Sequence, residues 1–100
     1  MSHPQVRLAP VVTSVRFTAA PRLDQQAGLL GSVACELDDM LGLDGIALRR
    51  TVRGELRLSF PERVDSTGRR HLLLRPLRAA AWRSMEQQVF DALRRQGMLP

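Results

Sequence analysis

Hydrophobic and polar residues alternate in three segments of the chain, and this two-residue period predicts β-strands. The alternation occurs in residues 11–17, 46–48 and 56–60. A tight turn near Gly54 would join the last two segments, and Pro61 would end the third. The sequence therefore predicts an antiparallel hairpin in the middle of the chain, preceded by at least one more strand.

The region after Pro61 is expected to be a loop followed by a short strand. Residues 61–69 contain Asp65-Ser66-Thr67-Gly68, a combination that favours a turn. Residues 70–75 alternate again, with Leu72 and Leu74 on one face.

From about Arg78 the hydrophobic period changes to that of an amphipathic helix. Its apolar stripe consists of Ala81, Met85, Val89 and Leu93. We expect the helix to dock on the sheet and to form one core with Leu56, Leu58, Leu72 and Leu74. The side chains expected to face water are Arg83, Glu86, Gln87, Asp91 and Arg94.

The pattern in residues 26–43 fits two structures. The spacing of Leu29, Val33, Leu37 and Met40 is typical of a helix, although glycines weaken it. Val33, Cys35 and Leu37 also alternate with polar or small residues, as a strand would. The residues alone leave both alternatives open.

The chain has 100 residues, of which 44% are hydrophobic and 25% charged, as in one ordinary globular domain. Its domain would cover residues 11–97, with residues 1–10 as a flexible arm and 98–100 as a tail. No uncharged run is long enough for a membrane span, and no signal-peptide core is visible. The single cysteine, Cys35, excludes an internal disulfide. We expect a soluble cytoplasmic protein.

The charge is strongly segregated, and all fifteen basic residues are arginine. Residues 1–22 carry +3, residues 23–48 carry −5, and residues 49–100 carry +7, which together give the net charge of +5. Arginine side chains match phosphate geometry well, so this distribution suggests a polyanionic partner. The alternative is that the arginines simply solvate a surface.

Six basic residues form the candidate nucleic-acid site, because they flank the exposed loop or the start of the helix. Free N–H groups in the first helical turn would add to their attraction for an anion. The competing interpretation is a solvated surface, with Arg78 stacked on Trp82 one turn further along. The six residues are Arg63, Arg69, Arg70, His71, Arg75 and Arg78.

No motif for catalysis, nucleotide binding or metal binding occurs in the chain. The acidic residues of segment 36–44 lack the spacing of a calcium loop. We therefore expect no enzyme activity, no cofactor, no metal and no small-molecule substrate. Trp82 could stack on a base but is expected in the core, and Cys35 is expected to act as a small buried hydrophobe.

The second half of the chain resembles the bacterial septation-protein family named for stage V sporulation protein G. The resemblance rests on Pro61, Gly68 and Pro76 at matching spacing, followed without a gap by the amphipathic helix. Upstream, residues 12–17 are similar to the opening strand of the family, and residues 33–38 to its second strand. The chain departs from the family at Val64, where a second basic residue is usual, and in Arg78-Ala-Ala-Ala81, which lacks the polar helix start.

The resemblance implies an α+β fold: a small antiparallel sheet of about five strands followed by one C-terminal helix. It implies a strand for residues 29–38. It also implies a homodimer that binds DNA or RNA with little sequence preference, in a regulatory role of the kind associated with septation, cell division and sporulation. Because one helix can cover only one face of such a sheet, we expect a second copy to cover the other face or an edge. The alternatives are an adaptor that binds an acidic protein and, less favoured, a small enzyme without a recognisable motif.

Overall fold

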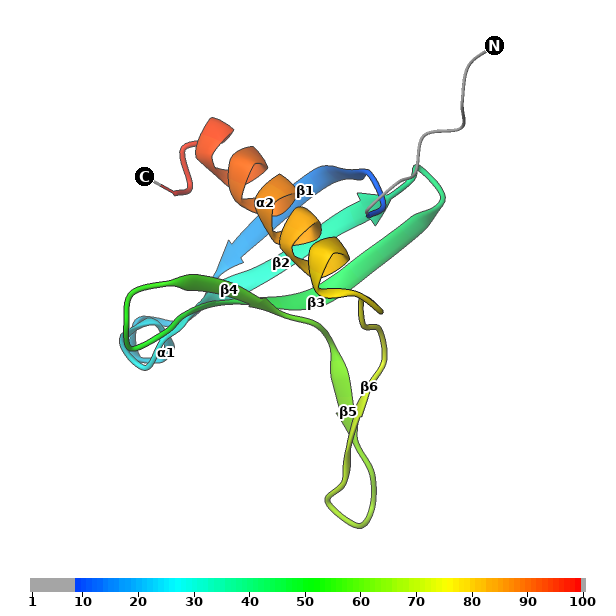
Figure 1. The fold of residues 1–100 in the computed structure, drawn as a ribbon. Coiled ribbons are helices and arrows are strands. Elements are labelled where there is room, and N and C mark those ends of the chain that lie inside the picture. Colours follow the sequence, from blue (N-terminus) through cyan, green and yellow to red (C-terminus); the bar gives the residue numbers. More distant parts are fainter. Residues whose placement is uncertain (1–8, 100) are drawn as a thin grey trace.

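The computed structural model describes residues 9–99 and contains six strands and two helices (Figure 1). The residues before Ala9, where most of the expected arm lies, and Pro100 are outside the described residues. In chain order the elements are β1 (Val12–Ala19), α1 (Arg22–Gln26), β2 (Leu29–Leu37), β3 (Leu41–Arg50), β4 (Leu56–Ser59), β5 (Glu62–Val64), β6 (Arg70–Leu72) and α2 (Ala79–Arg95).

The four longest strands form one antiparallel sheet in the order β1-β2-β3-β4. Residues 29–37 are strand and not helix, as the family resemblance implied. The segment pairs on both sides, with β1 and with β3, and its side chains alternate between buried and more exposed positions on the two faces of the sheet. Gly31 marks the tightest point: a side chain there would overlap the carbonyl of Thr18 and the ring of Phe17.

The α+β fold, a small antiparallel sheet followed by one C-terminal amphipathic helix, is confirmed; the six strands divide into this four-stranded sheet and a two-stranded one. Residues 62–64, expected to be part of a loop, form β5 and pair with β6, which covers residues 70–72 instead of 70–75. These two strands make a separate ribbon, which Figure 1 shows projecting away from the sheet. We call residues 62–72 the hairpin.

Helix α2 crosses one face of the four-stranded sheet and closes the core (Figure 1). Met85, Val89 and Leu93 are buried as expected, and so is Leu58. Leu72, which we placed in the core, is half exposed because it belongs to the projecting hairpin. Cys35 is buried as expected, and its burial raises the pKa of the thiol.

One polar side chain of α2 lies in this core, contrary to the sequence-based expectation. Glu86, predicted to face water, is only 5% exposed. Its Oε2 accepts a hydrogen bond of 2.9 Å from the backbone N–H of Leu58, on the outer edge of the sheet, and lies 3.4 Å from Nε of Arg57. The carboxylate thus accepts a hydrogen bond from a backbone N–H of β4, an edge strand with no further strand of the sheet beside it.

Helix α2 makes equivalent contacts with the opposite edge strand, β1. The amide of Gln88 accepts from the N–H of Val12 at 2.8 Å and donates to the carbonyl of Pro10 at 2.9 Å. Gln96 donates to the carbonyl of Val15 at 2.9 Å, next to a bulge where Ser14 has a φ of 52°. The helix therefore hydrogen-bonds both edges of the sheet.

The sheet face opposite α2 carries polar and small side chains, including Ser32, Glu36, Asp44 and Arg49, which are exposed. An antiparallel sheet can expose such a face to water. This face therefore gives no reason to expect a covering second copy.

Replacing Glu86 tests its role at the edge of the sheet. Glu86→Ala leaves the Leu58 N–H buried without an acceptor and should reduce the free energy of unfolding by about 1–3 kcal/mol. Glu86→Gln keeps a carbonyl acceptor and should cost less. Urea denaturation measures both variants, and equal stability of Glu86→Ala and the parent would contradict this role.

Val89, which is 1% exposed, tests the docking of the helix on the sheet. Val89→Asp would bury an unpaired carboxylate and should destabilise the fold by several kcal/mol, enough to unfold most of the chain. Thermal denaturation followed by circular dichroism measures this, and a melting curve like that of the parent would show that α2 does not dock here.

Candidate nucleic-acid interface

The tip of the hairpin is organised by one carboxylate. Asp65 Oδ1 accepts from the backbone N–H groups of Thr67 and Arg69 at 2.9 and 3.0 Å and from the Thr67 hydroxyl at 2.6 Å. Its Oδ2 lies 2.8 Å from Nε2 of His71. Gly68, with a φ of 83°, donates to the Asp65 carbonyl and closes the turn that the sequence predicted.

These hydrogen bonds hold the pKa of Asp65 well below its ordinary value of 3.8. The largest cause is the hydrogen bond from the Thr67 side chain, followed by that from His71 and by the backbone N–H of Arg69. Each of these contacts favours the ionised carboxylate. The loop is therefore fixed by a charged group and is ordered before any ligand arrives.

The hairpin has two different faces. Arg63 lies directly opposite His71 in the strand pairing, so their side chains share one face, and the Asp65–Arg69 pair continues that face. Residues 62 and 64 lie opposite residues 72 and 70, which places Glu62, Val64, Arg70 and Leu72 on the other face.

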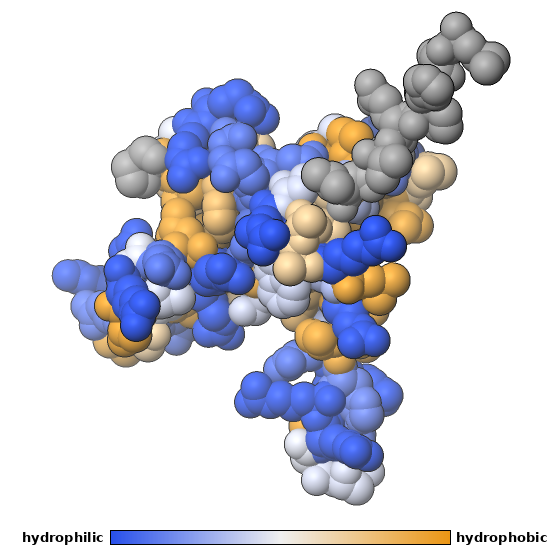
Figure 2. Space-filling view, viewed as in Figure 1, coloured by the Kyte–Doolittle hydropathy of each residue, from blue (hydrophilic) through white to orange (hydrophobic). Residues whose placement is uncertain are grey.

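Four of the six predicted site residues therefore lie together on the hairpin, and they differ in how they are paired. Arg70 forms an ion pair with Glu62, with Nη1 3.4 Å from Oε1. Among residues 9–99, neither Arg63 nor Arg69 forms an ion pair. Figure 2 shows hydrophilic residues over much of the projecting hairpin. The Arg63 and Arg69 guanidinium groups are thus the two that are available for an external anion.

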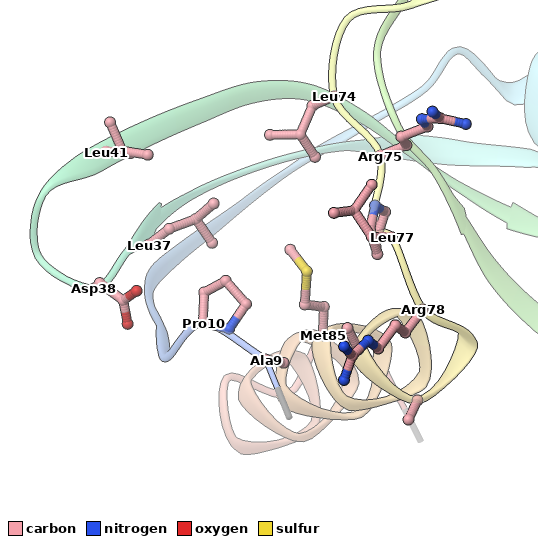
Figure 3. A pocket seen from close by; sticks show the side chains of 13 residues that line it. Ala9, Pro10, Leu37, Asp38, Leu41, Leu74, Arg75, Leu77, Arg78 and Met85 are labelled. Carbon is pink, nitrogen blue, oxygen red and sulfur yellow. The ribbon is translucent and has the colours of Figure 1, made fainter. Parts of the chain in front are cut away.

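The other two predicted residues, Arg75 and Arg78, lie elsewhere. They line an open groove of about 660 Å³ between the start of α2, residues 74–78 and the turn between β2 and β3 (Figure 3). Arg78 is the N-cap residue of α2, which has no side-chain cap and no acidic residue in its first turn. Neither arginine forms an ion pair within residues 9–99.

One basic residue near the hairpin was missed by the sequence analysis. Arg49 of β3 lines a pocket of about 580 Å³ at the base of the hairpin together with Arg70. Trp82 lines the same pocket, and its ring contacts Phe60 edge-on with centroids 5.2 Å apart. Arg49 is distant from the loop in sequence, so only the antiparallel pairing of β3 with β4 brings it near the hairpin.

The described residues show neither a metal cluster nor a membrane helix. Within residues 9–99, no three His, Cys, Asp or Glu side chains are arranged to hold a metal ion. No helix in this part of the chain is long and apolar enough to cross a membrane. Neither a scan against protein-family models nor a search of curated proteins found a match to this chain.

Asp65 provides a test of the order of the hairpin tip. Asp65→Ala removes the acceptor for two backbone N–H groups and should speed hydrogen exchange at Thr67 and Arg69 at least several-fold, while the exchange of core amides in β2 stays unchanged. Because the folded-state pKa of Asp65 lies below its ordinary value, the tip should stay ordered as the pH falls from 7 to 4 and loosen only at lower pH. Loss of protection at the tip between pH 5 and 4 would contradict this explanation.

Proposed function

We propose that this protein binds DNA or RNA through the hairpin, mainly by contacts to phosphate, and that it does so as a homodimer. One observation carries the proposal: a preordered hairpin projects from the body of the domain and presents Arg63 and Arg69 without ion-pair partners on one face. Arginine recognises phosphate through paired N–H donors. Because the loop that carries these arginines is already ordered, binding does not have to offset the loss of conformational entropy of its backbone.

The shape of the hairpin supports the same proposal. A two-stranded β-ribbon fits the major groove of B-form DNA. The hairpin is such a ribbon, with two strands of three residues each. Arg49 and Arg70 line the pocket beside the other face of the hairpin, so they would meet phosphates of a nucleic acid whose groove surrounds the ribbon. Such contacts carry little sequence information, so binding would tolerate many sequences.

The order of elements also agrees with membership of the septation-protein family, which remains part of this proposal. Paired strands that precede a C-terminal helix, with Gly68 in a turn between them, support this part of the proposal. A regulatory role is proposed on that resemblance alone. The alternative function, an adaptor for an acidic protein, would use the same unpaired arginines.

Salt dependence of binding tests the proposed phosphate contacts. Each phosphate contact contributes roughly 0.7–0.9 to the slope of log K against log salt concentration, so Arg63→Ala with Arg69→Ala should flatten this slope by about 1.4–1.8. The reduction should be similar for unrelated sequences, because the contacts are to the backbone. Fluorescence anisotropy with labelled random single- and double-stranded oligonucleotides measures the slope.

The matched control is Arg22→Ala with Arg53→Ala, which removes the same charge from exposed residues of α1 and of the turn between β3 and β4. The control should shift affinity slightly and leave the slope nearly unchanged. Equal effects of the two double variants would indicate an effect of net charge only. A parent protein that binds no oligonucleotide at low salt would rule out the proposed function and favour the adaptor.

A further inference from the structure

The groove beside α2 is open and lined mainly by apolar side chains. Figure 3 shows Leu37, Leu74 and Met85 pointing into it from the sheet, from the segment before α2 and from α2 itself. Two of the apolar side chains that line it are largely uncovered: Leu77 is 86% exposed and Leu41 is 65% exposed. Exposed apolar surface arranged in this way is typical of an interaction site.

The two ends of the groove carry opposite charge. The turn between β2 and β3 lies at one end and contains Asp38 and Asp39, while Arg75 and Arg78 lie at the other (Figure 3). Asp38 Oδ1 accepts from the N–H of Val11 at 2.9 Å and so fixes the acidic end against β1. The surface is therefore apolar in the middle, acidic at one end and basic at the other.

We propose that this groove is the interface between two copies of the chain, related by a two-fold axis that passes through its apolar centre. Such an axis would place the acidic end of one copy against the basic end of the other, twice over, and would pack Leu77 and Leu41 against the apolar surface of the partner. The inference rests on the proposed homodimer and assigns its surface.

A second copy fits this surface better than an unrelated partner does, because the surface is complementary to itself. In an isologous interface the same patch of both copies forms the contact. A patch that is acidic at one end and basic at the other is therefore complementary to a second copy of itself. The other surfaces offer less: the face of the sheet opposite α2 is polar, and hydrogen bonds from α2 reach both edges.

Single substitutions at exposed positions test the interface without disturbing the core. Leu77→Glu and Leu41→Glu should each convert a dimer of about twice the 11.2 kDa chain mass into a monomer, as measured by light scattering at micromolar concentration. Leu23→Glu and Val52→Glu are matched controls, because Leu23 is 79% exposed in α1 and Val52 lies fully exposed in the turn between β3 and β4. The control variants should remain dimers.

The result distinguishes this inference from the proposed function. A parent dimer that survives Leu77→Glu and Leu41→Glu would place the interface elsewhere and overturn the inference, and it would leave the proposed oligonucleotide binding untouched. A parent that is monomeric at every concentration would overturn both the dimer and its interface. Loss of dimer in the control variants as well would show that added negative charge, and not the groove, is responsible.

The charged ends provide an independent readout. Asp39 has a φ of 54°, a backbone conformation that asparagine also tolerates, so Asp39→Asn removes the charge and preserves the turn. Asp39→Asn and Arg78→Ala should each raise the dissociation constant of the dimer about two- to fivefold, the range expected for exposed ion pairs. The double variant should raise the dissociation constant by less than the product of the two single increases. An increase equal to that product would contradict a contact between these ends.

Discussion

The structure depends on one helix that satisfies both edges of a four-stranded sheet. Glu86 of α2 accepts from the N–H of Leu58 on β4, while Gln88 and Gln96 bond to backbone groups of β1. The apolar stripe between these side chains fills the core. A sheet of this width has two exposed edges that can invite pairing with other chains, and side chains of α2 and of its C-cap Gln96 form hydrogen bonds to both edges. The carboxylate and the amides therefore fix how the helix crosses the sheet.

This arrangement determines where the remaining basic residues can act. Glu86 accepts a hydrogen bond from Leu58 on the β4 edge, and after β4 the chain turns away from the sheet at Pro61 and pairs with itself to form the hairpin. Arg63 and Arg69 are carried away from the body of the domain, whereas Arg75 and Arg78 return with the chain to the groove at the start of α2. The predicted basic site is thus divided between two surfaces, and we assign them different roles.

Periodicity predicted most of this fold, and its failures have physical causes. The stripe of Met85, Val89 and Leu93 located α2 and its buried face. Glu86 was assigned to water because its partner, a backbone N–H on a distant strand, leaves no trace in the sequence. Residues 62–64 were expected to be a loop because this short strand is exposed on both faces and shows no hydrophobic alternation. Arg49 was missed because strand pairing alone brings it near Arg70.

The most direct test of the account is an NMR titration of the labelled protein with a random-sequence oligonucleotide at low salt. The account predicts that amide shifts concentrate in residues 62–72 and at Arg49, that they diminish as salt is added, and that the groove around Leu77 and Met85 shifts little. Shifts that centre on the groove, or a spectrum that does not change at all, would contradict the assignment of the hairpin as the nucleic-acid surface.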